Sequence, residues 1–311
     1  MRVCIFAHFD RDDRVDPYVL KYLAELRTVC QQVIFVSTSK LGETEQAKLT
    51  GLAERIILKP NVGYDFASWQ SGLAAVQLEH CTELVICNDS CYGPLAPLTS
   101  VFERMARRMT SEPCDFWGMT SNNQGHWHLQ SYFMVFRRAV IQSEAFANFW
   151  KEVGPRPTKI DVINDFEIGL STKLMAAGFH PATVFQWRFM SRIMFATHYM
   201  RALAIHFIFY LWVLTFPQSY KAKKLRADGY YFMRIKQLHQ VNLLHHLWRE
   251  VLASGVPFVK IELLRDNPLR AKTGGALEFI NSLSPEMAAA AKNHLSRLTS
   301  GIESPAEHVK F

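Results

Sequence analysis

The tripeptide Asn88-Asp89-Ser90 has the residue types that bind a hard divalent cation, and it directly follows an apolar stretch, 83–87. Carboxylate, amide and hydroxyl oxygens are the ligands that Mg²⁺ and Mn²⁺ prefer, and such a metal keeps positions open for a diphosphate. Asp89 is therefore a candidate metal ligand. The same residue types also favour turns and helix caps, where their side chains bond to nearby backbone groups. A single carboxylate leaves both interpretations open.

A second candidate for chemistry is a carboxylate in the segment 165–178, which has helical spacing and ends at Gly178. Glu167 would act as a general base if a pocket raised its pKa toward neutrality. Asp165 is another candidate, but residues two apart do not share a helix face, so only one of these carboxylates would point into a given site. The structural alternative is a capping box formed by Asn164 and Glu167.

Two shorter motifs carry weaker signals. In the segment from Asn61 to Asp65, Gly63 permits close approach of the backbone to a ligand. Asp65 would either cap the helix that follows or bond to a ribose or a base. His126 and His128 alternate, so on a strand they would share one face and would be placed to bind a metal or an acceptor. A surface loop is the alternative for this pair.

The elements that must position these residues alternate between strand-like and helix-like segments. Short apolar runs at 3–7, 32–37, 55–58 and 83–87 are separated by segments of helical spacing, which predicts right-handed βαβ units and a mostly parallel sheet. Ligands of such sheets bind at the carboxyl ends of the strands. The polar residues that follow the four strands are therefore expected to meet at one edge: His8 and Asp10, Ser37, Asn61 and Gly63, and Asn88, Asp89 and Ser90.

The composition is that of a folded protein of one large or two ordinary domains. The chain has 311 residues, of which 49% are hydrophobic and 20% charged, and this excludes disordered, collagen-like and low-complexity classes. The apolar run at 1–6 is too short for a signal peptide, and the six cysteines fit reduced, buried thiols. Both features predict a cytoplasmic protein.

The net charge of +7 is concentrated in one stretch, 188–236, which holds nine basic residues and one acidic residue. Within it, 199–216 is almost wholly apolar, and the basic run 221–226 follows. This pattern is typical of a helix that lies on an anionic membrane surface. A buried core helix is the alternative, and Arg201 and His206 argue against a membrane span. A nucleic-acid partner is not expected, because no binding module accompanies the charge.

Several motifs, in order along the chain, resemble the rhamnan synthesis F family of glycosyltransferases. They cover most of residues 3–270 and are more specific together than any one of them alone: 61–69 (NVGYDFASW), 88–95 (NDSCYGPL), 116–120 (FWGMT), 128–133 (HLQSYF), 167–171 (EIGLS) and 257–268 (PFVKIELLRDNP). The wider pattern is similar to inverting family-2 sugar transferases of GT-A fold. Asn61-x-Gly63 stands where those enzymes have an Asn-x-Gly motif at the start of a helix on the nucleotide side of the site.

The resemblance implies roles for individual residues. Asn88-Asp89-Ser90 stands at the metal motif, and Glu167 stands at the catalytic base, although the family-2 pattern has two aspartates in the metal motif and an aspartate as base. A divalent cation, Mn²⁺ or Mg²⁺, is the implied cofactor. The resemblance also implies two sets of binding residues. The donor side comprises His8, Asp10, Ser37, Asn61, Gly63, Asp65, Asn88, Asp89 and Ser90, and the acceptor or phosphate side comprises Trp117, His128, Ser131, Lys260 and Arg265.

The implied fold is α/β: a GT-A-like (Rossmann-like), mostly parallel sheet flanked by helices, with a helical, apolar and basic C-terminal part. We expect a nucleotide-sugar-binding catalytic domain at 1–185 and an apolar, basic, membrane-associating insertion at 186–240. A return segment at 241–270 would complete the catalytic domain, and 271–311 would form a helical tail, with a surface helix beginning near Ser284.

The implied activity is transfer of a sugar, with rhamnose as one candidate, from a nucleotide-diphosphate donor. The acceptor would be a glycan or a lipid-linked intermediate of lipopolysaccharide, capsule or rhamnan assembly. A membrane-facing basic helix would place the enzyme on the inner face of the plasma membrane. The alternative is a non-catalytic module that binds a sugar nucleotide or takes part in polysaccharide assembly at the membrane.

Overall fold

A computed structural model describes residues 1–123, 125–185, 242–269 and 271–299, together with the isolated positions 200, 207, 211 and 215. The expected membrane-associating insertion at 186–240 therefore lies almost wholly outside the described residues. Within the described part, no helix has both the length and the apolar character needed to cross a membrane.

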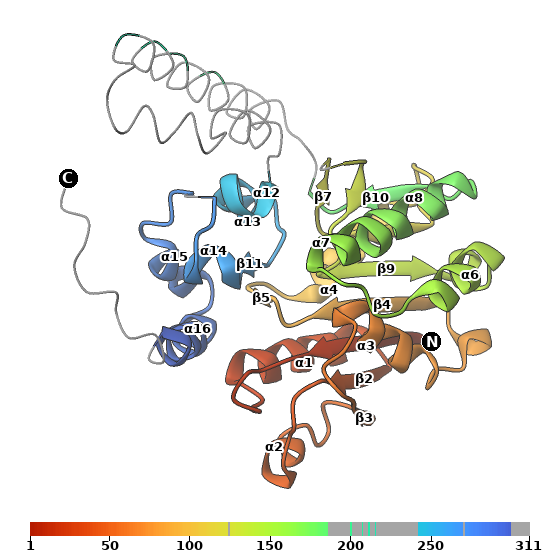
Figure 1. Cartoon of the computed structure of the whole chain (residues 1–311), viewed down its shortest axis with the longest axis horizontal. Helices are drawn as coiled ribbons and strands as arrows, with labels where there is room; N and C mark the ends of the chain where they lie inside the picture. The colour runs from red at the N-terminus through yellow and green to blue at the C-terminus, as the bar shows by residue number, and fades with distance from the viewer. Residues whose placement is uncertain are drawn as a thin grey trace.

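Seven strands form the central sheet, in the spatial order β10-β6-β9-β4-β1-β2-β3 (Figure 1). All neighbouring pairs are parallel except those made by β9, which runs antiparallel to β4 and β6. The strands are β1 (Arg2–His8), β2 (Gln32–Ser37), β3 (Arg55–Leu58), β4 (Glu83–Asn88), β6 (Phe116–Gly118), β9 (Phe133–Arg137) and β10 (Pro181–Thr183). The predicted α/β class and the mostly parallel sheet flanked by helices are confirmed.

Two hydrophobic cores lie on the two sides of this sheet, because successive side chains of a strand point to opposite faces. Cys4 and Phe6 of β1 belong to one core, with α1 (Pro17–Val29) and α4 (Leu98–Arg108). Val3 and Ile5 belong to the other, with α3 (Tyr64–Leu73), α5 (Arg138–Ile141), α6 (Glu144–Glu152) and α8 (Gly169–Ala176). All six cysteines are buried and free.

The C-terminal part returns to the sheet domain. It comprises α12 (Leu243–His246), α13 (Trp248–Ala253), β11 (Val259–Lys260), α14 (Ile261–Arg265), α15 (Ala276–Leu283) and α16 (Pro285–Thr299). β11 pairs antiparallel with β5 (Cys91–Tyr92), the short strand that follows the Asn88-Asp89-Ser90 motif. Buried side chains of all five helices belong to the same core as α1 and α4.

The remaining elements are short. They are α2 (Glu43–Ala47), η1 (Leu78–His80), the hairpin of β7 (Ser121–Asn122) and β8 (His128–Leu129), α7 (Lys159–Val162) and the π-helical segment η2 (Ile163–Ile168). The helix expected at 165–178 thus begins earlier, at α7, and runs through η2 into α8. Its capping box is formed by Thr158 and Asp161 rather than by Asn164 and Glu167. The capping-box alternative for Glu167 is therefore wrong, because the helix already exists where Asn164 would have started it.

Candidate functional site

A pocket of about 600 Å³ opens at the carboxyl-terminal edge of the sheet. Its walls come from the segments after β1 and β4, the first turn of α3, and residues of β11, α14 and α16. Six residues of the predicted site line it: Asp10, Asp65, Asp89, Ser90, Lys260 and Arg265. Residues from both ends of the chain therefore share one cavity.

A chain of hydrogen bonds crosses the floor of the pocket. Asn88 Nδ2 donates to Asp65 Oδ2 at 2.7 Å, and Ser90 Oγ donates to Asn88 Oδ1 at 2.6 Å. Lys260 Nζ in turn donates to Ser90 Oγ at 3.0 Å. Lys260 can reach Ser90 because the β11–β5 pairing places it opposite Cys91. Asn88, which is buried at the end of β4, thus orients the two side chains of the pocket on either side of it.

The carboxylate of Asp89 is held in place and poorly solvated. Its Oδ2 accepts the backbone N–H of Phe9 at 2.8 Å, and its backbone carbonyl accepts the hydroxyl of Tyr18 at 3.2 Å. Burial raises the pKa of Asp89 well above its ordinary value, and the charges of Asp65 and Asp10 raise it further. Burial also raises the pKa of Asp65, against the opposing effect of the bond from Asn88. Lys260 and Lys159 partly offset the rise in the pKa of Asp65, so burial is the main reason that both carboxylates are costly to charge.

This donor set fits a hard divalent cation. Asp89 and Asp65 offer carboxylate oxygens, Ser90 offers a hydroxyl, and a doubly charged ion would relieve the unfavourable charging of both acids. Asp89 stays a predicted ligand for Mn²⁺ or Mg²⁺, and Asp65, which lines the same pocket, is a further carboxylate that would be available to such an ion. Bound there, such an ion would act as a Lewis acid that stabilises negative charge on a diphosphate.

Glu167 and Asp165 occupy different environments. Glu167 is half-buried, and its Oε1 accepts the backbone N–H of Ser131 at 3.0 Å. Its charge is one of those that raise the pKa of Asp65, so it lies beside the pocket although it does not line it. Asp165 is exposed and pairs with Arg156 at 2.5 Å. Of the two candidate bases, Glu167 is the one whose charge is among the leading influences on the pKa of Asp65, and the backbone N–H of Ser131 holds its carboxylate.

Besides Asn88, which is buried next to the pocket, four predicted donor-side residues do not line it. His8 and Ser37 are buried at the ends of β1 and β2 and share a hydrogen bond of 2.9 Å between Nδ1 and Oγ. They support the pocket indirectly, because Ser39 donates its N–H to Ser37 and its hydroxyl to the backbone carbonyl of Asp10. Asn61 is exposed, and Gly63 precedes α3 with a positive φ of 86°. Neither of these two lines the pocket.

Burial lowers the pKa of His8 to about 4, against an ordinary value of 6.5. The unfolded chain therefore binds a proton that the folded chain does not, and this residue's contribution to the free energy of unfolding falls as the pH drops from 6.5 toward 4. We expect the wild type to lose about 2 kcal/mol more than His8→Asn between pH 7 and pH 4.5. Urea unfolding at both pH values measures the difference. Equal losses of unfolding free energy in the two proteins would contradict the lowered pKa of His8.

Trp117 and His128, two residues predicted for the acceptor side, do not line the pocket. Trp117 is fully buried on β6 and packs edge-on against Phe102 at 5.1 Å between ring centroids, so it belongs to the core and not to the pocket. A buried aromatic residue within a strand, as Trp117 is in β6, fills a core position as readily as it contacts a ligand, and the sequence does not distinguish the two. His128 is buried, and its Nδ1 contacts the backbone carbonyl of His126 at 2.8 Å. Neither histidine belongs to a group with metal-binding geometry among the described residues.

A family comparison agrees with this architecture. The sequence model of the family described as Rhamnan synthesis protein F matches residues 33–213, which is more than half of the chain. The chain belongs to the rhamnan synthesis protein F family. It is also similar to Virulence protein VirA of Vibrio anguillarum, with 30% identity over 278 residues, 86% of this chain and 80% of VirA.

Solved structures with similar chain traces are distant in sequence. The 4-diphosphocytidyl-2C-methyl-D-erythritol synthase of Anaerococcus prevotii has 11% identity and a TM-score of 0.40, covering 64% of this chain and 96% of its own. The glucosyl-3-phosphoglycerate synthase of Mycobacterium tuberculosis, in complex with Mn²⁺, UDP-glucose and phosphoglyceric acid, has 12% identity and a TM-score of 0.34, covering 60% and 84%. The fold assignment rests on the sheet topology itself.

The pocket of this rhamnan synthesis protein F family member also contains residues that the sequence pattern does not single out. Phe9 and Tyr18 come from the β1–α1 region, Lys159 from α7, and His294 and Leu298 from α16. Phe9 lies between the predicted residues His8 and Asp10, so its position directly after β1 is the feature of the sequence that could have identified it as a pocket residue. His294 and Leu298 lie four apart on one helix face, but that spacing fits an ordinary amphipathic helix equally well.

Proposed function

We propose that this rhamnan synthesis protein F family member transfers a sugar from a nucleotide-diphosphate donor. The observation that carries the proposal is the charge arrangement of the pocket, where Asp65 and Asp89 form an acidic floor and Lys159, Lys260 and Arg265 provide cations. Acids that hold a divalent cation beside basic side chains are what a diphosphate ester requires. Family membership supports the same activity.

The size of the pocket supports a ligand of this class. Pockets for small molecules and cofactors range over roughly 300–1,000 Å³, and this one is about 600 Å³. In the proposed complex, the diphosphate lies between the acids of the floor and Lys260 and Arg265. The exposed ring of Phe9, at the end of β1, lines the same pocket and offers an apolar surface to the nucleoside.

Glu167 is the proposed general base. It accepts the proton of the acceptor hydroxyl while that oxygen forms a bond to the anomeric carbon on the face opposite the diphosphate. The bond from that carbon to the diphosphate oxygen breaks, and the diphosphate leaves with the electron pair. Lys260 and Arg265 stabilise its charge. Attack from the opposite face inverts the anomeric configuration.

The finer assignments rest on the family and on the sequence. The family description, Rhamnan synthesis protein F, supports rhamnose as the sugar and a growing polysaccharide as the acceptor. A lipid-linked precursor in lipopolysaccharide, capsule or rhamnan assembly is part of the proposal. The basic and apolar stretch 188–236 supports peripheral binding to the anionic inner face of the plasma membrane. Flotation with anionic vesicles tests the membrane assignment, and failure of the wild-type protein to float would contradict it.

Binding and transfer assays test the proposed function. A panel of nucleotide sugars, each with and without Mn²⁺, is expected to contain one that raises the melting temperature by several degrees and donates its sugar to an acceptor glycan. Tight binding without transfer to any acceptor glycan would favour the alternative, a binding module for polysaccharide assembly. If no nucleotide sugar binds, the proposal of a sugar transferase is wrong.

A further inference from the structure

Helix α16 forms part of the pocket although it comes from the far end of the described chain. It lies against α1 (Figure 1). Its Met287 and Ala291 are buried, and its His294 and Leu298 line the cavity. The helix was expected to be a surface helix of a separate tail. Its contacts with α1 instead bring it to the segment that connects β1 to α1.

Arg297 of α16 makes a concentrated set of ionic contacts with that segment. Its guanidinium donates to Asp10 Oδ2 at 2.5 Å and to Asp10 Oδ1 at 3.2 Å. It also pairs with Asp12 and Asp16. In addition, the side chain of Arg11 donates to the backbone carbonyl of Arg297 at 2.7 Å. One side chain thus joins three carboxylates spread over seven residues of the chain.

Asp10 transmits these contacts to the pocket. It is 6% exposed, and its Oδ1 accepts the backbone N–H groups of Asp12 and Arg14, so it fixes the turn that follows β1. Burial acts to raise the pKa of Asp10, but the bonds from Arg297 and from the backbone hold it below its ordinary value. The residue before Asp10 is Phe9, whose N–H bonds to the Asp89 carboxylate.

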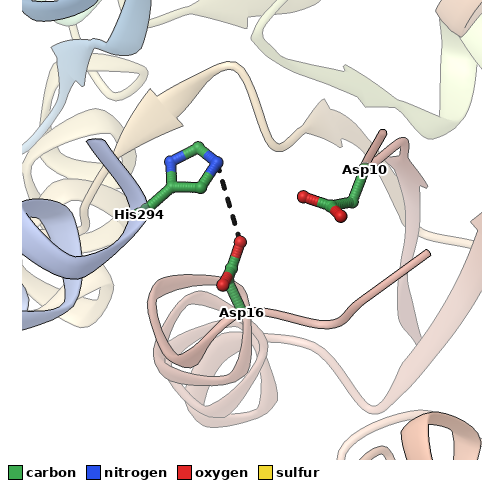
Figure 2. A group of neighbouring side chains, drawn as sticks. All are labelled: Asp10, Asp16 and His294. Carbon is green, nitrogen blue, oxygen red and sulfur yellow. Dashed lines mark ion pairs between the residues drawn. The ribbon is translucent and has the colours of Figure 1, made fainter. Parts of the chain in front are cut away.

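A metal ion is the other means by which such a group of acids could be neutralised. Figure 2 shows Asp10, Asp16 and His294 converging from the end of β1, the start of α1 and α16, and their ligand atoms lie within 4.8 Å of one another. However, Arg297 already binds both carboxylates. His294 Nδ1 shares a hydrogen bond with the Tyr92 hydroxyl at 2.8 Å. The protein therefore supplies the compensating charge itself.

We propose that Arg297 is a positioning residue for the nucleotide-diphosphate site. It holds the turn after β1 in the shape that lets Phe9 bond to Asp89, and it cancels carboxylate charge that would otherwise repel a diphosphate. The inference rests on the proposed function and goes beyond it, since it assigns part of donor binding to a helix outside the sheet. Arg297 itself does not line the pocket.

The test measures the dissociation constants of UDP and dTDP with Mn²⁺ by titration calorimetry on the full chain. We expect Arg297→Met to weaken binding of whichever diphosphate the wild type prefers by at least about tenfold. Arg297→Lys, which keeps the charge but not the forked geometry, is expected to be at least threefold weaker than wild type and stronger than Arg297→Met. Adding Asp16→Asn to Arg297→Met should recover at least threefold, because it removes an uncompensated charge.

A matched control separates positioning from simple docking of the helix. Glu286 of the same helix pairs with Lys21 of α1 but does not line the pocket, so Glu286→Gln should bind the diphosphate within about twofold of wild type. If Arg297→Met folds and binds the diphosphate with wild-type affinity, this inference is wrong but the proposed function is unaffected. If Arg297→Met does not fold, Arg297→Lys decides, and wild-type affinity in that variant overturns it. If the wild type binds neither UDP nor dTDP, the same titrations use the diphosphate of whichever nucleotide sugar the panel identifies, and a wild type that binds no nucleoside diphosphate contradicts the proposed function and this inference with it.

Discussion

Replacing Glu167 with glutamine is expected to reduce the rate of sugar transfer by at least about 100-fold, and by up to about 10,000-fold, the range found for loss of a general base. Glutamine keeps an oxygen that can accept the backbone N–H of Ser131, now bonded to Glu167 Oε1 at 3.0 Å. The shape of the site is therefore preserved and only the basicity is lost. Donor affinity, measured by titration, should stay within about twofold of wild type.

The neighbouring acid provides the control for this prediction. Asp165 is exposed and pairs with Arg156 at the surface, so Asp165→Asn should change the transfer rate by less than about threefold. If Asp165→Asn is the variant that loses activity and Glu167→Gln is not, the assignment of the base is wrong. If neither variant changes a demonstrated transfer activity, the base lies elsewhere in the protein.

Asp89→Asn is expected to lower the transfer rate by about 100- to 1,000-fold, which is typical of removing a group that stabilises developing charge. The amide oxygen can still accept the N–H of Phe9, so the loss reflects the missing negative charge and the cation it would hold. The dependence of donor binding on Mn²⁺ should disappear. Titration of the donor with and without the metal, beside a transfer assay, measures both effects.

The same substitution should leave the melting temperature of the metal-free protein unchanged or raise it. The pKa of Asp89 is raised in the fold, mainly by burial, so the charged form costs stability near neutral pH and its removal relieves repulsion of Asp65. Asp115→Asn is the matched control, because Asp115 also accepts a backbone N–H, that of His180 at 2.9 Å, but does not line the pocket. We expect it to change activity by less than about threefold. Equal losses in the two variants would count against a specific role for Asp89.

The sheet could be predicted because its strands are short apolar runs that end at polar residues. The runs at 3–7, 32–37, 55–58 and 83–87 correspond to β1, β2, β3 and β4, and their order along the chain gives parallel neighbours. The sequence contains no local signal for the antiparallel direction of β9, because the apolar pattern of a buried strand is the same in either direction.

The site was predictable where residues follow strands directly and less so elsewhere. Asp10, Asp89 and Ser90 reach the pocket because they come immediately after β1 and β4, and Lys260 and Arg265 were implied only by the family resemblance. Trp117 is an aromatic residue of a kind that often contacts ligands, but here it is fully buried in the core.

The contribution of α16 could not be read from its sequence. The contacts between Arg297 and Asp10 join residues 287 positions apart, and the composition of a helix does not specify which distant partner it will meet. A local pattern predicts that the helix is amphipathic, whereas the identity of the surface it covers depends on the completed tertiary structure.

The distance along the chain between Asp10 and Arg297 also bears on how this protein is made. A ribosome has released the strands of the main sheet long before it reaches α16, so the carboxylates after β1 emerge early and stay without their arginine during most of synthesis. Long-range contacts of this kind form late, because the intervening chain must first be ordered. A growing polypeptide can therefore assemble its central sheet before Arg297 exists, and the turn after β1 gains its ionic contacts only with the last turns of the final described helix.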